Sequence, residues 1–240
     1  MLSFFKQLLQ RRSSGLKDLC PVFYSQYEQD QWLFENFYKV KLGGTFIEVG
    51  ADDGVDKSNT YFFENQLDWT GLCIEPSPDR FKLLRENRRC FCEEYAITER
   101  YGEVEFLDIS GWGKGLSGVV DNYDPQHLER IERELEHAEN IGNRLIRVPT
   151  LPLSSLLEKH NITHVDFCSI DTEGSELEVI KSIDFSTVTI DIFLIEDNYG
   201  DISVKRTLEG HGYTLICKIG IDNVFLRNNS KLEYTKDLDI

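Results

Sequence analysis

Two apolar segments in the N-terminal half end in residues that suit nucleotide binding. Residues 44–49 are mostly apolar and lead into a turn bounded by Gly50 and Gly54. Residues 71–76 are also mostly apolar and carry the acid Glu75 near their end, 25 positions after Gly50. In open α/β sheets, an acid at the tip of the second strand can accept hydrogen bonds from both ribose hydroxyls of a nucleotide held over the first turn. The two segments therefore predict a site for an adenosine-containing cofactor.

The turn indicates which cofactor this is. Dinucleotide folds use G-x-G-x-x-G, so that backbone N–H groups meet a pyrophosphate. Here Asp52 and Asp53 lie between Gly50 and Gly54. Two carboxylates at that point would repel a pyrophosphate, whereas they suit the ammonium and sulfonium groups of S-adenosylmethionine. The alternative for this segment alone is an ordinary strand–turn–helix with solvated aspartates.

Carboxylates also follow two later segments that are typical of the fourth and fifth strands of the same sheet. Segment 163–171 leads to Asp171 and Glu173, and segment 188–196 ends in Glu196. Ligands of such sheets bind outside the carboxyl ends of the strands, so these tips form one candidate site. The residues at the tips are Glu48, Gly50, Asp52, Asp53, Glu75, Ala96, Asp171, Glu173, Glu196, Asp197 and Asn198.

The number of acids at one edge predicts a bound cation. Like charges held close together raise one another's pKa unless a cation lies between them. Asp171, Glu196 and Asp197 are oxygen ligands of the kind that Mg²⁺ prefers. A metal there would bind a substrate hydroxyl and lower its pKa. The alternative is that Asp171 orients a methyl donor or acts as the base directly, with no metal.

The rest of the chain predicts the scaffold for these tips. The 240 residues, 40% of them hydrophobic, suit one α/β domain of alternating strands and helices. A third strand is expected at 94–97, and a hairpin at 213–227 adds an antiparallel edge strand to a mostly parallel sheet. The expected parts are an N-terminal extension (1–24), a domain (25–230) with an insertion at about 111–143, and a C-terminal tail (231–240).

The insertion begins with a glycine-rich loop at 111–117 and continues as a charged segment at 124–140. Leu128, Ile131 and Leu135 recur at helical spacing, which predicts an amphipathic helix with a solvated charged face. Such a helix is either a lid over the strand tips or an ordinary surface helix. We expect the specificity for the acceptor to reside in this insertion.

The charge of the chain limits its partners. The formal net charge is −16, and nothing resembles a basic stripe. A small-molecule or carbohydrate acceptor is therefore expected, and nucleic acid is not. Residues 1–9 are apolar on one side but far too short to span a bilayer, so no transmembrane segment is predicted. Without a signal peptide the expected location is cytoplasmic, and the oligomeric state stays open.

Four segments together resemble the FkbM family of S-adenosylmethionine-dependent methyltransferases. They are Ser25-Gln26 with Asp30, FIEVGADDG at 46–54, SIDTEGSELEVI at 169–180 and DNVFLRN at 222–228. The D-x-E-G-x-E element that starts at Asp171 is the most distinctive of the four. The resemblance runs from about Ser25 to Asn228, which is nearly the whole domain.

The resemblance implies a class I methyltransferase fold, a Rossmann-like α/β sheet of seven mostly parallel strands with a terminal antiparallel hairpin. It also implies O-methylation of sugars or other small hydroxylated metabolites. Glu48 and Gly50 would line the methionine part, Glu75 would bind the ribose, and Ala96 would lie near the adenine. Asp171 would face the reacting methyl group. The cofactor-binding candidates are Gln26, Glu48, Gly50, Asp53, Ser58, Asn59, Glu75, Pro76, Ala96 and Asp171.

A metal is implied by one related pattern, in which an acid of the fourth strand and two acids of the fifth hold the ion. Asp171, Glu196 and Asp197 can reproduce that pattern. The predicted cofactors are therefore S-adenosylmethionine together with Mg²⁺ or Mn²⁺.

The general base is the point at which the chain departs from such relatives. Some metal-dependent sugar O-methyltransferases carry the base three residues after the strand-four acid, and that position is Gly174 here. Glu173 or a histidine of the insertion, His127 or His137, could substitute. Asp171 and Glu173 are the catalytic candidates.

Two other functions compete with methyl transfer. An NAD-dependent oxidoreductase has a similar sheet, but the Asp52–Asp53 turn disfavours its pyrophosphate. A noncatalytic adenosyl-binding scaffold would have no need to concentrate acids around Asp171. Binding of S-adenosylhomocysteine, NAD and Mg²⁺ separates the three functions.

Overall fold

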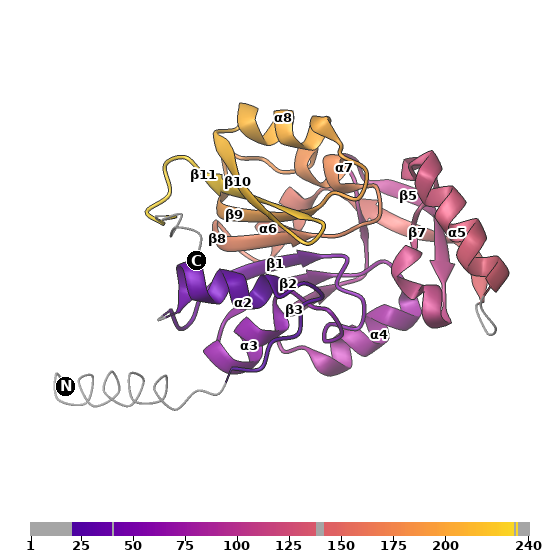
Figure 1. Cartoon of the computed structure of the whole chain (residues 1–240), viewed down its shortest axis with the longest axis horizontal. Helices are drawn as coiled ribbons and strands as arrows, with labels where there is room; N and C mark the ends of the chain where they lie inside the picture. Colours follow the sequence, from indigo (N-terminus) through magenta and orange to yellow (C-terminus); the bar gives the residue numbers. More distant parts are fainter. Residues whose placement is uncertain (1–20, 40, 138–141, 233, 235–240) are drawn as a thin grey trace.

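A seven-stranded sheet forms the centre of the structure, a computed structural model that describes residues 21–39, 41–137, 142–232 and 234 (Figure 1). The order of its strands is β10-β11-β9-β8-β1-β2-β3. The strands are β1 (Thr45–Val49), β2 (Thr70–Ile74), β3 (Phe91–Glu93), β8 (His164–Ile170), β9 (Thr189–Glu196), β10 (Tyr213–Ile219) and β11 (Asp222–Arg227).

The pairing confirms a mostly parallel sheet with a terminal antiparallel hairpin. The five strands from β3 to β9 in this order pair in parallel. Strand β11 pairs antiparallel with both β9 and β10. The prediction of an antiparallel strand at the edge of the sheet is therefore wrong in the position of that strand. The hairpin joins the sheet through its second strand, so the antiparallel strand lies second from the edge.

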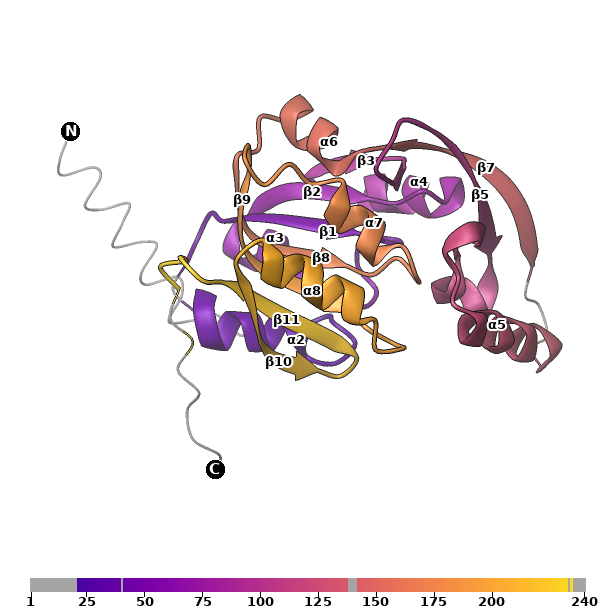
Figure 2. The same ribbon diagram turned by 90° about the horizontal axis from the view of Figure 1, so that it is seen from above.

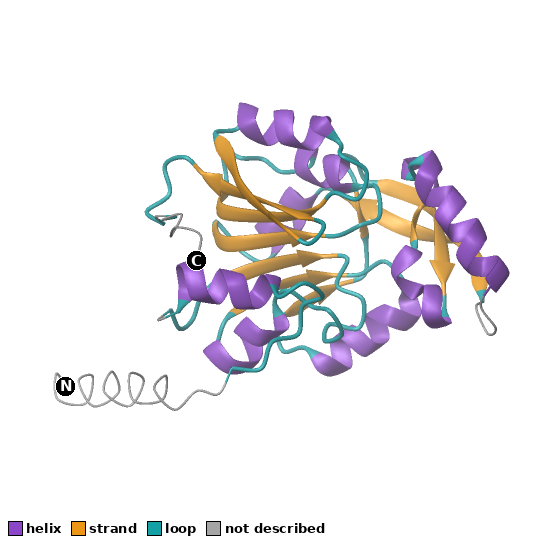
Figure 3. Ribbon diagram, in the orientation of Figure 1, coloured by secondary structure: helices purple, strands orange, loops and turns teal. Residues whose placement is uncertain are grey.

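Helices cover both faces of this sheet (Figure 3). Residues on one face, including Phe46 and Phe167, pack with side chains of four helical segments in an aromatic cluster. Residues on the other face, including Ile47 and Cys168, pack with three helices in an aliphatic cluster. The first group is α2 (Gln29–Leu33), the π-helical turn η1 (Phe34–Tyr38), α3 (Tyr61–Leu67) and α4 (Pro78–Asn87); the second is α6 (Leu153–Lys159), α7 (Glu176–Lys181) and α8 (Ile202–Gly210). Because both faces are covered, the central strands are apolar along nearly their whole length.

A second sheet of four strands, in the order β4-β7-β5-β6, extends from the main one. Its strands are β4 (Ala96–Ile97), β5 (Gly102–Ile109), β6 (Gly118–Val119) and β7 (Asn143–Leu151). The predicted third strand at 94–97 is wrong, because β3 takes that place in the main sheet and β4 pairs with β7 instead. Residues 102–109 alternate between apolar and polar side chains, a pattern that favours a strand, and they form β5.

The insertion is the connection between β5 and β7. It contains the 3₁₀ segments η2 (Gly111–Leu116) and η3 (Val120–Asn122) and the helix α5 (Pro125–His137). Ile131 and Leu135 of α5 pack with Leu116 and Tyr123, which attaches the helix to the segments before it. Figure 2 shows β5 and β7 curving away from the main sheet, so that α5 faces the carboxyl ends of the strands. The last residues of the predicted helix, 138–140, lie outside the described part of the chain.

Gly50 lets the first and fourth strands meet at the site. It follows β1 with φ 84°, and a Cβ atom there would lie 1.7 Å from the carbonyl oxygen of Asp171. The amide of Asp171 donates to the carbonyl of Val49 at 3.0 Å. A side chain at position 50 would therefore break the contact that places Asp171 next to the first turn.

No helix in the described part of the chain is long and apolar enough to cross a membrane.

Candidate functional site

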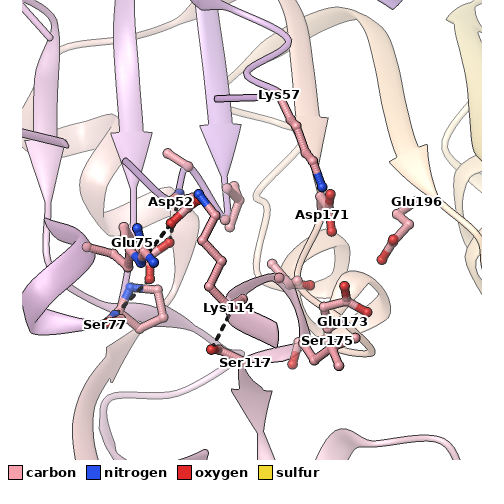
Figure 4. A pocket seen from close by; sticks show the side chains of 18 of the residues that line it. Asp52, Lys57, Glu75, Ser77, Lys114, Ser117, Asp171, Glu173, Ser175 and Glu196 are labelled. Carbon is pink, nitrogen blue, oxygen red and sulfur yellow. Dashed lines mark hydrogen bonds and ion pairs between the residues drawn. The ribbon is translucent and has the colours of Figure 1, made fainter. Parts of the chain in front are cut away.

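A cavity of about 610 Å³ lies between the strand tips and the insertion. Small-molecule sites occupy roughly 300–1,000 Å³. Figure 4 shows Glu75 and Asp52 at one side, and Asp171, Glu173 and Glu196 at the other. The residues of the predicted site that line the cavity are Gln26, Glu48, Gly50, Asp52, Ser58, Asn59, Glu75, Pro76, Ala96, Asp171, Glu173, Glu196 and Asn198. Among the predicted residues whose side chains the structure describes, Asp53, Asp197 and His127 do not line it.

One end of the cavity is apolar and comes from the second sheet. Ala96 of β4, Phe106 of β5 and Val119 of β6 line it and belong to one buried cluster. The sequence places Ala96 here as the tip of a third strand, whereas the structure brings it here through β4. Phe106 and Val119 have no predicted role. The alternating pattern of β5 indicates that Phe106 is buried, but it does not show which site the ring borders.

Glu75 lies beside this apolar end, at the tip of β2. One carboxylate oxygen accepts from the amide of Asp52 at 2.9 Å, and the other accepts from the amide of Ser77 at 2.8 Å. Burial raises the pKa of Glu75 to about 8, and the negative charge of Asp52 adds to the rise. Each oxygen keeps a lone pair for a further donor, since a carboxylate has about four acceptor sites.

The two aspartates of the turn interact with the protein's own groups. Asp52 forms ion pairs with Arg80 at 3.1 Å and with Lys114 at 2.7 Å. Asp53 accepts from the amides of Val55 and Asp56, both at 2.9 Å. Of the two aspartates only Asp52 lines the cavity, and its charge is paired with Arg80 and Lys114. That the turn repels a pyrophosphate and suits a cationic cofactor stays a prediction.

Glu48 fastens the loop after the turn to β1. Its carboxylate accepts from the Ser58 hydroxyl at 2.8 Å, the Asn59 amide at 2.8 Å and the Thr60 hydroxyl at 2.6 Å. Arg88 reaches the same carboxylate at 3.2 Å. Four donors leave Glu48 largely satisfied by the protein, so it shapes the wall of the cavity by holding this loop.

Asn59 lines the cavity and carries an acceptor that no group in the described part of the protein satisfies. Its side-chain nitrogen donates to the Ser169 hydroxyl at 2.9 Å. Its side-chain oxygen is buried and has no hydrogen-bond partner in the protein. A buried acceptor without a partner costs free energy, which a ligand N–H group would recover. The oxygen of Asn59 is therefore an unsatisfied acceptor in the wall of the cavity.

Three carboxylates converge at the opposite end of the cavity. One oxygen each from Asp171, Glu173 and Glu196 lies within 4.8 Å of the others. Asp171 is open to the cavity but surrounded by protein in its other directions. Burial raises the pKa of all three groups, and the negative charge of Asp171 raises the pKa of Glu173 and Glu196 further, whereas a hydrogen bond with Glu196 lowers the pKa of Asp171. Asp222, which accepts from Gln29 at 2.6 Å, adds a nearby negative charge.

Glu173 is held in the cluster by an uncommon backbone conformation. Its φ is 54°, and Gly174 follows with φ 117° against the carbonyl of Asn122. The Oε2 atom of Glu173 is buried without a hydrogen bond and lies 3.2 Å from Nδ1 of His127. His127 is buried on α5, and burial lowers its pKa. His127 thus stands behind Glu173, while the side chain of His137 lies outside the described residues.

Asp197 points away from the predicted metal position. It accepts from the amides of Gly200 at 2.7 Å and Asp201 at 3.0 Å, and from the side chain of Asn223 at 2.8 Å. These bonds build the turn after β9. The structure therefore replaces Asp197 by Glu173 in the candidate trio. The sequence Asp197-Asn198-Tyr199-Gly200 carries a turn signal that could have shown this.

The insertion supplies further charged residues that sequence reasoning does not single out. Lys114 of η2 lies near the turn after β1, and Arg130 and Glu134 of α5 lie toward the acids. Arg130 and Glu134 pair with each other at 3.3 Å. Helical spacing identifies this pair as neighbours, but only the fold shows that they face the cavity.

The strand order, the glycine turn after β1 and the cavity at the carboxyl edge define a class I methyltransferase fold. A family model described as "Methyltransferase FkbM domain" matches residues 48–215. The chain belongs to this family of methyltransferases, for which S-adenosylmethionine is the expected methyl donor.

Solved structures with similar folds include three methyltransferases. Methyltransferase FkbM from Methylobacillus flagellatus is 12% identical with a TM-score of 0.43, and the match covers 77% of this chain and 43% of that chain. A methyltransferase from Pyrococcus furiosus is 9% identical with a TM-score of 0.41 and coverages of 94% and 98%. A putative tRNA methyltransferase from Streptococcus pneumoniae is 10% identical with a TM-score of 0.39 and coverages of 81% and 68%. No curated protein matches the chain.

Proposed function

We propose that the protein transfers a methyl group from S-adenosylmethionine to a hydroxyl of a sugar or another small hydroxylated molecule. The observation that carries this proposal is one continuous cavity with two chemically different ends. An apolar pocket beside Glu75 suits adenosine. A cluster of acids beside Asp171 suits the activation of a hydroxyl.

The residues of the first end fit the methyl donor in three places. Ala96 and Phe106 form an apolar wall for the adenine, and Glu75 retains acceptor capacity for the ribose hydroxyls. The partnerless oxygen of Asn59 suits the ammonium of the methionine part. S-adenosylmethionine supplies an activated methyl group, and the protein holds donor and acceptor in line for the displacement.

The residues of the second end suit a hydroxyl as the acceptor. In the metal-free form of the reaction, burial makes Glu173 a stronger base than an exposed carboxylate, so it is the group that would take the hydroxyl proton. Asp171, beside Gly50, orients the acceptor against the methyl group. Arg130 and Glu134 add donors and acceptors to this part of the wall, as a polyhydroxylated molecule requires.

A divalent cation is part of this proposal. Oxygen ligands around Mg²⁺, with bonds of ~2.1 Å, lie roughly 3–4 Å apart. One oxygen each of Asp171, Glu173 and Glu196 lies within 4.8 Å of the others, which places the three carboxylates around one point. These three residues would hold the ion, which would act as a Lewis acid on the acceptor oxygen.

The charges of the cavity support a small acceptor over nucleic acid. The chain carries a net charge of −16, and carboxylates line the acceptor end. A polyanion would meet repulsion at that end, whereas a neutral polyol would not. Membership of a methyltransferase family also argues against the alternative function, an NAD-dependent oxidoreductase.

The test is a binding and transfer experiment on the full chain. We expect S-adenosylhomocysteine to raise the melting temperature and NAD to have no effect. Radiolabelled S-adenosylmethionine should then deliver label to one class in a panel of sugars, polyols, amines and RNA. Absence of stabilisation by S-adenosylhomocysteine would refute the cofactor. Binding without transfer to any member would favour the noncatalytic scaffold, and labelled amines or RNA would refute the acceptor class.

Above pH 8, where Glu75 is mostly ionised, replacing it by Ala should weaken S-adenosylhomocysteine binding roughly 10- to 100-fold. A hydrogen bond to a charged group contributes about 1.5–3 kcal/mol, and the ribose would lose this acceptor. Titration calorimetry measures the affinity, and circular dichroism checks that the variant folds. Glu86→Ala, an exposed change on α4, is the control. An unchanged affinity for Glu75→Ala would place the ribose elsewhere.

The affinity for S-adenosylhomocysteine should rise with pH up to about 8. Ribose donors favour the ionised form of Glu75, whose pKa is about 8 without ligand, so ligand binding expels a proton. Below that pKa the affinity should fall by up to about tenfold per pH unit. Calorimetry from pH 6 to 9 in two buffers of different ionisation enthalpy measures the released proton. Glu75→Gln should abolish this part of the profile; an identical profile would assign the proton to another group.

A further inference from the structure

Lys114 joins the insertion to the turn after β1. Its ammonium lies 2.7 Å from Asp52, 3.1 Å from Asp56 and 3.8 Å from Asp53. The side chain of Lys114 is 22% exposed and lines the cavity. Figure 4 shows it reaching from the insertion toward Asp52 beside Glu75. A residue of the insertion therefore reaches three acids that are about sixty positions earlier in the sequence.

The backbone of Lys114 is anchored independently of these ion pairs. Its carbonyl accepts from the hydroxyl of Ser117 at 2.9 Å, and that hydroxyl also accepts from the amide of Ile109 at the end of β5 at 3.0 Å. The next anchor is the carbonyl of Leu116, which accepts from the hydroxyl of Tyr123 at 2.8 Å. These hydrogen bonds fix the C-terminal part of η2 to β5 and to Tyr123, and the side chain of Lys114 connects η2 to the turn after β1.

We propose that Lys114 is a positioning residue for the cofactor, which holds η2 against the Asp52 turn and so closes the wall over the ribose beside Glu75. This inference rests on the proposed S-adenosylmethionine site. Segment η2 contributes several lining residues, and a wall that is already in place does not have to be ordered when the cofactor binds. Loss of Lys114 should therefore weaken binding mainly through faster dissociation of the cofactor.

The ion pairs also control the charge around Glu75. Asp52 donates its amide to Glu75, and the charge of Asp52 raises the pKa of that carboxyl, while Arg80 of α4 lowers it. Lys114 compensates Asp52 from the side of η2. On the β5 side, Asp108 accepts from Ser77 at 2.8 Å and is itself paired with Arg144. Removing Lys114 leaves Asp52 less compensated, so Glu75 should hold its proton to higher pH.

The experiment compares Lys114→Met, Lys114→Arg and wild type in the full chain, with S-adenosylhomocysteine as the probe. A partly exposed ion pair changes an equilibrium constant by up to about fivefold. Lys114 makes two such pairs shorter than 3.2 Å. We expect Lys114→Met to bind roughly tenfold more weakly and to release the ligand correspondingly faster in stopped flow. Lys114→Arg should restore most of the affinity. High salt should weaken wild type more than Lys114→Met.

The pH profile separates positioning from a merely structural role. The pH at which the affinity for S-adenosylhomocysteine is half its maximum should be higher in Lys114→Met than in wild type. In Lys114→Arg this midpoint should stay near the wild-type value. The control is Lys205→Met on α8, where Lys205 pairs with Glu209 at 3.8 Å and does not line the cavity. Equal affinity, release rate and midpoint in wild type and Lys114→Met would overturn this inference alone. Failure of wild type to bind S-adenosylhomocysteine would overturn the proposed function with it.

Discussion

Replacing Asp171 by Asn should lower kcat by roughly 10²–10⁴-fold while leaving S-adenosylhomocysteine affinity within about threefold. Asp171 lies where the first and fourth strands meet, with its amide bonded to Val49 and its side chain open to the cavity. The amide of Asn keeps the size of the side chain but loses the charge that would orient the acceptor. Because the change acts on the transition state, kcat should fall and cofactor binding should not.

Single-turnover methyl transfer and calorimetry on the same preparation measure the two quantities. Asp68→Asn is a matched control: Asp68 is exposed after α3 with φ 57°, a conformation that Asn also adopts readily. Equal losses in turnover and affinity would make Asp171 a cofactor-binding residue. An unchanged kcat would remove it from the chemistry altogether.

The sequence predicts the main sheet well because its signals are local. Each central strand is an apolar run, and Gly50 and Glu75 mark the tips of the first two. The D-x-E-G-x-E element after β8 marks the fourth strand, and the antiparallel hairpin follows from Gly220 between two apolar runs. In a parallel sheet all such tips share one edge, so the strand pattern also predicts where the site lies.

The second sheet could not be predicted in the same way because its pairing is nonlocal. Ala96 and Ile97 pair with Thr150 and Leu151, more than fifty positions later, across the whole insertion. Nothing within 94–97 distinguishes a strand of the main sheet from a strand of another sheet. The apolar end of the cavity depends on this pairing, so only the fold shows that Phe106 borders it.

The roles of individual acids depend on backbone conformation, which residue type does not reveal. Asp197 follows directly after β9, yet a turn directs its carboxylate to backbone amides. Glu173 enters the cluster because its φ is 54°. Asp52 meets Lys114 only because the insertion folds back over the first turn. Strand position therefore locates the set of acids, and the loop geometry decides which of them face one another.

This distinction leads to the prediction that a divalent cation binds Asp171, Glu173 and Glu196 without Asp197. Three carboxylates with raised pKa values around one point are destabilised when ionised, and Mg²⁺ would neutralise them. The sulfonium supplies one positive charge, but methyl transfer removes it. We expect EDTA treatment to lower activity by at least about tenfold, since Lewis-acid stabilisation contributes several kcal/mol, and Mg²⁺ or Mn²⁺ to restore it.

Paramagnetic resonance of bound Mn²⁺ gives a readout that does not require turnover. Glu173→Gln and Glu196→Gln should weaken Mn²⁺ binding, because each removes the negative charge of one of three converging carboxylates. Asp197→Asn is the matched control, since its carboxylate already serves the turn and should leave the affinity unchanged. Equal weakening by Asp197→Asn would restore the trio expected from strand position. Full activity in EDTA, with no Mn²⁺ bound, would remove the metal and leave Glu173 as the direct base.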